Sequence, residues 1–164
     1  MTFRLPLSAL LSQVLTAFTT EFDHDVAAAG YPELSLPLGS NVMRFLSEDG
    51  LRIGIIAELA GVSKQAISQQ ISYLERHGYV AVEPDPGDNR AKVVRLTRLG
   101  TETRDVCRPL FATIERRWQR VYGADEVRRL RDALEALTSQ LDSHLPHYPP
   151  RAVDSGTRTD PNRT

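Results

Sequence analysis

Residues 83–100 of the 164-residue chain read EPDPGDNRAKVVRLTRLG. Two prolines, a glycine and three acidic residues fill the first six positions, and a run of basic and apolar residues follows. Proline stiffens the backbone and glycine permits a sharp reversal. Because residues 79–83 and 92–96 are rich in β-branched side chains, the stretch predicts a β-hairpin with Arg90 at its tip.

The charged side chains of this hairpin suit a surface that reaches a nucleic acid. We expect Asp88 to accept hydrogen bonds from the turn amides or to pair with Arg90, which then points outward. A guanidinium on a narrow tip can enter a minor groove, and Lys92 and Arg95 are placed to reach phosphates. The alternative is an ordinary surface hairpin with solvated charges, after which Thr97 caps the next helix.

The sequence IAELAGVSKQAISQQI at residues 56–71, just before the hairpin, predicts a helix-turn-helix. Its two helices are expected over 53–60 and 63–77. The motif needs a small residue, a turn glycine, an apolar plug, an N-cap and a β-branched residue, found here as Ala57, Gly61, Val62, Ser63 and Ile67.

The second of these helices has two unlike faces. Ile67, Ile71 and Leu74 fall on one face at 100° per residue. The opposite face carries glutamine, serine and arginine, whose side chains hydrogen-bond to base edges and phosphates. The candidate DNA-contacting residues of this helix are Ser63, Lys64, Gln65, Ser68, Gln69, Ser72 and Arg76. The alternative is a polar face that touches only solvent.

Long apolar faces flank this central part of the chain. Residues 7–29 carry apolar side chains every three or four positions, and residues 125–143 carry a heptad-like leucine seam. A winged helix of ~60–70 residues cannot cover both faces, and exposed patches of this size mark interfaces. A short helix is expected over 38–46, and a long one over 98–122 that Pro109 should kink.

The charge is unevenly distributed along the chain. The net charge is −1, but residues 61–131 hold 14 basic and 9 acidic residues, a net charge of +5. Positive charge therefore gathers where the helix-turn-helix and hairpin lie, as expected of a DNA-binding region. A charged solvated face would look the same. Residues 146–164 hold four prolines and show no periodicity, and they predict a disordered tail.

Two segments resemble the MarR family of bacterial transcriptional regulators. DPGDNRAKVVRLTRLG, residues 85–100, is similar to the family's wing, and LAGVSKQAISQQISYLERHGYV, residues 59–80, is similar to its recognition helix. The resemblance covers about residues 5–143. It implies a mainly α protein with a small β-hairpin wing: a winged helix-turn-helix at about 38–97, flanked by dimerisation helices at about 5–29 and 98–143, in a single domain over 1–145.

The same resemblance implies a homodimer that straddles a double-stranded operator, two recognition helices ~34–36 Å apart. It also implies a repressor relieved by a small-molecule effector bound between the dimerisation helices and the winged helix. Aromatic residues that could line such a pocket, or equally belong to the core, are Phe18, Phe22, Phe45, Phe111 and Trp118. The rival interpretation is a winged-helix protein-interaction module that does not bind DNA.

Other chemistry finds little support in the sequence. No phosphate-binding loop, nucleophile elbow or catalytic triad is present, so neither an enzyme nor a cofactor is expected. His24, His77, His144 and His147 lack partners at metal-ligand spacing. The single cysteine, Cys107, is either a buried structural thiol or an oxidation sensor. With no signal peptide or membrane-spanning run recognised, a cytoplasmic location is expected.

Overall fold

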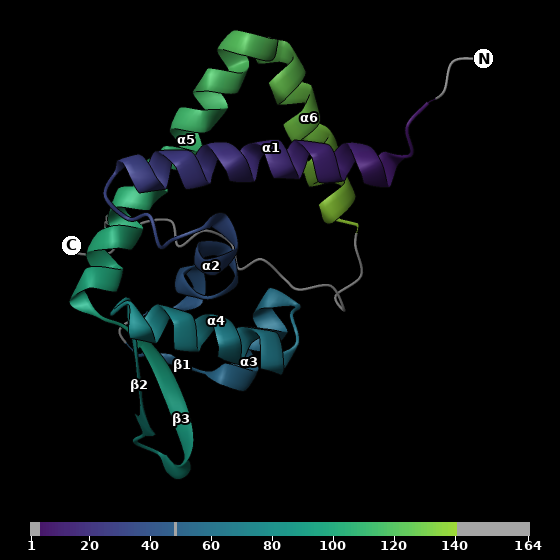
Figure 1. The fold of residues 1–164 in the computed structure, drawn as a ribbon. Coiled ribbons are helices and arrows are strands. Elements are labelled where there is room, and N and C mark those ends of the chain that lie inside the picture. Colours follow the sequence, from purple (N-terminus) through teal and green to yellow (C-terminus); the bar gives the residue numbers. More distant parts are fainter. Residues whose placement is uncertain (1–3, 48, 141–164) are drawn as a thin grey trace, which may run out of the picture.

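The computed structural model describes residues 4–47 and 49–140. Figure 1 shows a largely helical chain with one small sheet. The elements in chain order are α1 (Leu7–Ala28), α2 (Leu36–Asn41), η1 (Met43–Phe45), β1 (Leu51–Arg52), α3 (Ile53–Ala60), α4 (Lys64–Arg76), β2 (Val80–Asp85), β3 (Asp88–Leu96), α5 (Arg98–Tyr122) and α6 (Ala124–Thr138). This confirms the predicted fold class. The tail predicted for 146–164 lies outside the described residues.

The helix-turn-helix forms where the sequence predicted it. Gly61 ends α3 in the left-handed conformation, with φ of 63°, as the predicted turn requires. Ser63 caps α4, because its hydroxyl accepts a hydrogen bond of 3.2 Å from the amide of Ala66. Ala57 and Ile67 are both buried, so the small and β-branched residues pack the two helices together as expected.

The sheet is larger than the sequence indicated. Its strand order is β1-β3-β2, all antiparallel, and the two-residue strand β1 was not predicted. The hairpin strands continue to Asp85 and Asp88, which leaves only Pro86 and Gly87 in the turn. Arg90 lies two residues past Asp88, in the irregular part of β3 between the pairs Asp85–Asp88 and Pro84–Lys92, so it is close to the turn but not in it. Regular pairing of β3 with β2 begins at Lys92, where the second strand was predicted to start.

One of the two remaining central helices differs from its predicted range, and the other matches it. The helix expected over 38–46 ends at Asn41, and Val42 takes a non-helical conformation before the 3-10 turn η1. Through this break Val42, Met43, Phe45 and Leu46 all reach the core. Further along the chain, α5 has the predicted bounds and contains Pro109, and the kink expected there stays a prediction.

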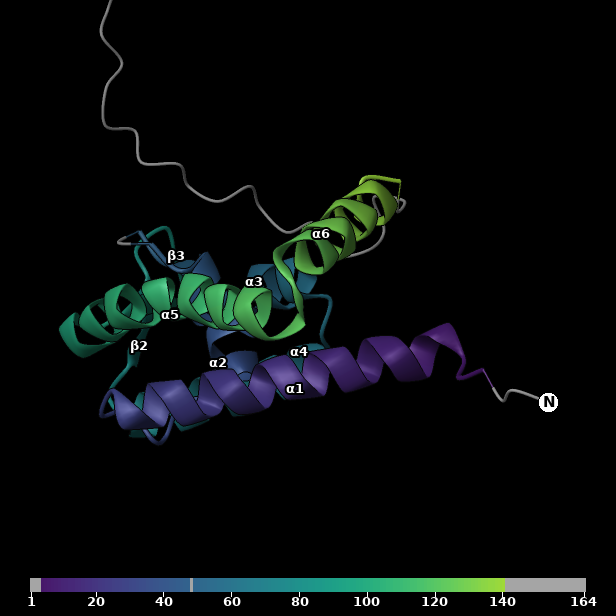
Figure 2. The same cartoon turned by 90° about the horizontal axis from the view of Figure 1, so that it is seen from above.

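The core lies between the second half of α1 and the winged helix. Val26 of α1, Ile56 of α3, Leu74 of α4 and Val94 of β3 are fully buried in it, and Ile114 joins them from α5. No residue of α6 is buried. In Figure 2, α6 and the N-terminal half of α1 diverge from each other.

The hairpin joins α5 through a very close contact. The Thr97 hydroxyl caps α5, accepting from the Gly100 amide at 3.0 Å, and it donates to the carbonyl of Gly78 at 2.6 Å. A Cβ on Gly100 would lie 2.0 Å from the carbonyl oxygen of Tyr79. The capping role expected of Thr97 is confirmed, and the glycine three residues after it has a steric reason. No described helix is long and apolar enough to span a bilayer.

Candidate nucleic-acid interface

The outer face of α4 displays most of the side chains that the sequence singled out. Lys64, Gln65, Gln69, Ser72 and Arg76 are exposed, while the apolar face of the same helix is buried. Their functional groups are therefore open to a partner. The structure thus brings these candidates together on one surface.

Two serines of α4 have part of their hydrogen-bonding capacity engaged within the helix. Ser63 uses its oxygen as the N-cap. Ser68 is half-buried and donates its hydroxyl to the carbonyl of Lys64 at 2.8 Å. Each retains unused capacity, but both are more constrained than the neighbouring glutamines.

Hydrogen bonds to the loop between α1 and α2 also hold α4 and the residues that follow it. The Tyr73 hydroxyl donates to the carbonyl of Glu33 at 3.0 Å, and Tyr79, just beyond the helix, bonds the Glu33 carboxylate at 3.3 Å. Burial and the Glu33 charge raise the pKa of Tyr79 to about 12, so its hydroxyl stays protonated as a donor. The loop between α1 and α2 therefore holds α4 and the residue Tyr79 that follows it in place.

The turn of the hairpin is organised by two aspartates. Asp85 accepts from the amide of Gly87 at 2.8 Å, and Asp88 accepts from the amide of Arg90 at 3.0 Å. Asp88 therefore accepts a hydrogen bond from a backbone amide, as expected, although that amide belongs to β3 and not to the turn. The side chains of Arg90 and Lys92 are exposed, and Figure 1 shows the hairpin projecting on the side of the molecule opposite α1.

Arg52 is a wing residue that the sequence reasoning missed. From β1 its Nε and Nη2 both lie 2.6 Å from Oδ2 of Asp85, and Nη2 lies 3.9 Å from Asp88. The Gly87 amide and then Arg52 lower the pKa of Asp85, which stays ionised. A two-residue strand offers no periodicity to detect, so Arg52 could not be placed beside the hairpin in advance.

Arg95 differs from the other predicted phosphate contacts. Its side chain is mostly covered, and its Nε lies 3.4 Å from a Glu83 carboxylate oxygen. Arg95 pairs with Ala81 and Val93 pairs with Glu83, so Arg95 and Glu83 are diagonal neighbours on one face of the sheet. Arg95 is therefore primarily a cross-strand partner.

The five aromatic candidates for a ligand pocket do not line one cavity. Phe22 and Phe45 are buried core residues. Phe18 packs on Phe111 and Trp118, with ring centroids 6.2 and 5.5 Å apart, in a cluster between α1 and α5. This set is mainly core, and of the five Trp118 alone lines either of the two pockets described next.

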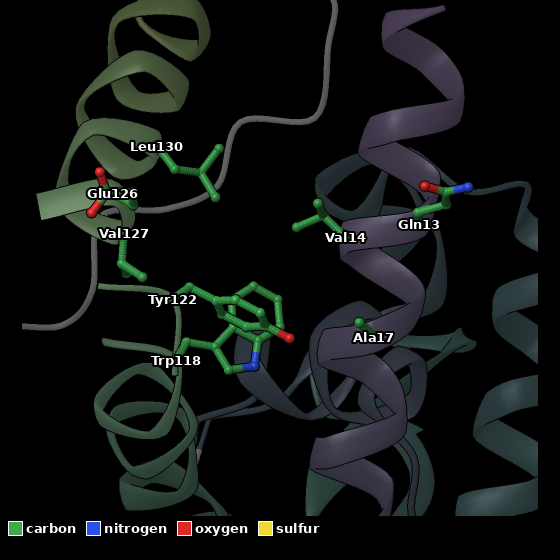
Figure 3. A pocket seen from close by; sticks show the side chains of 8 residues that line it. All are labelled: Gln13, Val14, Ala17, Trp118, Tyr122, Glu126, Val127 and Leu130. Atoms are coloured by element: carbon green, nitrogen blue, oxygen red, sulfur yellow. The ribbon is translucent and has the colours of Figure 1, made fainter. Parts of the chain in front are cut away.

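Figure 3 shows that pocket, an apolar space of about 320 Å³ between α1 and the corner of α5 and α6. Its lining residues are Gln13, Val14, Ala17, Trp118, Tyr122, Glu126, Val127 and Leu130. A second, more polar space of about 580 Å³ lies behind α4 and includes Asp23, Glu33 and Gln70. The side-chain amide oxygen of Gln70, Oε1, is buried there without a hydrogen-bond partner in the described part of the chain.

An ion-pair network ties α1 to α5 beside the first pocket. Arg117 donates to Glu21 at 2.7 Å and to Asp25 at 2.9 Å, and the Trp118 indole donates to Glu21 at 2.7 Å. Partial burial alone would raise the pKa of Asp25, but hydrogen bonds from His24 and Arg117 outweigh it and lower that pKa. The network fixes the second half of α1, whereas the first half has exposed leucines.

Other candidate chemistry remains without a site in the described residues. Cys107 is partly buried, and burial raises the pKa of its thiol to about 11, which disfavours the reactive thiolate. No cluster of three potential metal ligands occurs among the described residues. His144 and His147 lie outside them.

A helix-turn-helix followed by a projecting hairpin defines a winged helix-turn-helix protein. Residues 40–91 match the sequence model of the MarR family. Over 58 residues the chain is 36% identical to the transcriptional activatory protein BadR of Rhodopseudomonas palustris, covering 35% of this chain and 33% of BadR. The match thus spans about a third of that relative.

Solved structures extend the likeness to most of the chain. The S. aureus MepR–DNA complex matches with a TM-score of 0.68 and 18% identity, covering 84% of this chain and all of that one. The transcriptional repressor CouR bound to a 23-mer DNA duplex matches with a TM-score of 0.65 and 26% identity, covering 82% and 90%. The segment 40–91 of this chain is thus similar to the MarR family, and the fold of most of the chain is shared with a solved transcriptional regulator of that family from Rhodococcus sp. RHA1.

Proposed function

We propose that the protein is a sequence-specific, DNA-binding transcriptional regulator of bacterial type that acts in the cytoplasm as a homodimer. The observation that carries the proposal is the joint display of two surfaces by one subunit. The exposed glutamines of α4 can read base edges in a major groove, and Arg90 and Lys92 of the hairpin can contact the adjacent backbone or minor groove. The proposed contacts are Ser63, Lys64, Gln65, Ser68, Gln69, Ser72, Arg76, Arg90 and Lys92, with a secondary role for Arg95.

The exposed apolar faces support the dimer. Leu7, Leu11 and Leu15 on α1 and Leu134 and Leu137 on α6 are exposed in the single chain. Burial of these leucines against a second copy would remove apolar area from water at ~25 cal/mol per Å². Two-fold pairing would also present two recognition helices to one operator.

We further propose that DNA binding represses transcription and that a small molecule relieves it. CouR from Rhodococcus jostii RHA1, of the same fold, has been crystallised with p-coumaroyl-CoA. Of the two pockets of this chain, the larger, more polar one beside α4 is the better candidate for an effector site. Gln69, Gln70 and Tyr73 of the proposed recognition helix line it. A ligand there would contact the helix that reads DNA.

Selection from random duplexes with the purified full chain tests the proposal. We expect one enriched, near-palindromic sequence. Gln69→Ala should relax preference at one base pair by about 1–3 kcal/mol, and Arg90→Ala should weaken binding to all duplexes and flatten its salt dependence. Arg98→Ala, an exposed arginine paired with Glu102 outside the hairpin, is the control.

Absence of any enriched duplex would favour the rival function, a protein-interaction module. A reporter driven by the selected operator then separates repression from activation. Expression that falls when the protein is present supports repression, and expression that rises contradicts it.

A further inference from the structure

Arg52 occupies a position from which one side chain controls the end of the hairpin. Strand β1 pairs with β3 at Arg52 and Val93, so Arg52 belongs to the sheet but not to the hairpin. Its guanidinium reaches across to the last residue of β2 and contacts Asp85 through two nitrogens. Asp88, the first residue of β3, lies on the other side of the turn at 3.9 Å.

The distribution of charge in the hairpin explains why the contacts of Arg52 with Asp85 and Asp88 are important. Residues 80–96 hold three acidic and three basic side chains, so the hairpin alone has no net charge. Glu83 is paired with Arg95. The two remaining acids, Asp85 and Asp88, both face Arg52, whereas no ion pair joins Arg90 or Lys92 to an acid in the described part of the chain.

We propose that Arg52 is a positioning residue of the DNA interface: it clamps and neutralises Asp85 and partly offsets the charge of the more distant Asp88, so that the positive charges of Arg90 and Lys92 dominate the hairpin as it approaches DNA. This inference rests on the proposed function. Without Arg52 two carboxylates would stand near the phosphates uncompensated, and repulsion would oppose the contacts of the basic residues.

A direct contact between Arg52 and a phosphate is the competing explanation, and a mutant cycle separates the two. Affinity for the selected operator is measured for wild type, for Arg52→Ala, for the doubly neutralised hairpin Asp85→Asn with Asp88→Asn, and for the triple variant. Asparagine keeps an oxygen that can accept from the turn amides, so the turn geometry is retained.

A clamp acting through the aspartates gives a specific pattern. Arg52→Ala should weaken binding on the order of tenfold in the wild-type hairpin, but by less than about twofold in the neutralised hairpin. Arg52→Lys, which keeps the charge but not the two-nitrogen contact, should fall between. Because the Arg52 side chain is 49% exposed, thermal unfolding should shift little, and Arg98→Ala serves as the matched surface control.

Each other outcome overturns the inference in a recognisable way. An equal loss in both hairpins would mean that Arg52 itself contacts DNA. No loss for Arg52→Ala, while Arg90→Ala still weakens binding, would remove the clamp and leave the proposed function standing. If neither Arg52→Ala nor Arg90→Ala changes binding, the wing does not meet DNA, and this part of the proposed function fails together with the clamp.

Discussion

The winged helix and the outer helices of this chain bury their apolar residues to very different degrees. Ile67, Leu74 and Val94 are completely covered, whereas Leu7 and Leu137 are 65% and 57% exposed. The winged helix satisfies its own hydrophobic requirement within one chain. The first half of α1 and all of α6 do not, which indicates that their stability depends on a further surface.

The largest expected effect comes from making the same substitution in both regions and comparing the losses in unfolding free energy. Leu74→Ala should cost about 2–5 kcal/mol of unfolding free energy because it leaves a cavity in a fully covered site. Leu137→Ala in α6 should cost less than about 1 kcal/mol in the dissociated subunit, since its side chain is exposed in the single chain and is buried only in the proposed dimer. Urea unfolding measures both, and equal costs would contradict the contrast.

The second prediction concerns the partner of the outer helices. Leu130→Glu with Leu134→Glu should convert a dimer to a monomer and lower operator affinity by about 100-fold, because carboxylates cannot be buried in an apolar interface. Sedimentation velocity and binding titration measure the two effects. Arg128→Glu adds the same charge on the other side of α6 and is the control. A dimer that survives the double change would place the interface elsewhere.

A third prediction tests the joint between the two regions. Gly100→Ala should destabilise the protein by about 1–3 kcal/mol, because the new Cβ would meet the Tyr79 carbonyl at 2.0 Å. At Gly39 in α2 a Cβ would have nothing within 4 Å, and alanine there should be neutral or slightly stabilising. Thermal melts distinguish the pair, and similar melting points for both would show that the joint can relax.

The smallest effect is expected in the acid range. Since the folded pKa of Asp25 lies below its unfolded value, its stabilising contribution is complete above about pH 4 and is lost as the pH falls through the folded pKa. Asp25→Asn should therefore lower stability at neutral pH and reduce its decline between about pH 5 and pH 2. Urea midpoints across this range provide the measurement. An unchanged pH profile would show that the ion pair between Asp25 and Arg117 does not contribute to the stability of the protein.

The fold could be predicted where local chemistry decides it. Gly61, Ser63 and the apolar face of α4 act within a few residues, so their pattern in the sequence was sufficient. The ion-pair partners of Arg52 and Arg95 could not be predicted, because these partners lie on other strands and are set by strand register. Arg90 lies close to the turn, but the irregular stretch of β3 that holds it depends on the register of β2 and β3 and could not be predicted.

The exposed polar face of α4 was predictable because a helical wheel needs only the sequence. The residues that line the two pockets were not, because aromatic composition does not distinguish a cavity wall from a core. Phe22 and Phe45 fill space between helices that meet only in three dimensions.

The contact of Gly100 with the Tyr79 carbonyl has a mechanical consequence. With Thr97 also bonded to Gly78, α5 has no hinge at its root and must move together with the base of the hairpin. A 25-residue helix is about 37 Å long at ~1.5 Å per residue, so tilting it by roughly 5° displaces the far end by about 3 Å. A change in the direction of the first turns of α5 is thereby transmitted to the base of the hairpin, whereas Pro109, which lacks an amide hydrogen, is a point at which the distal part of α5 can bend separately.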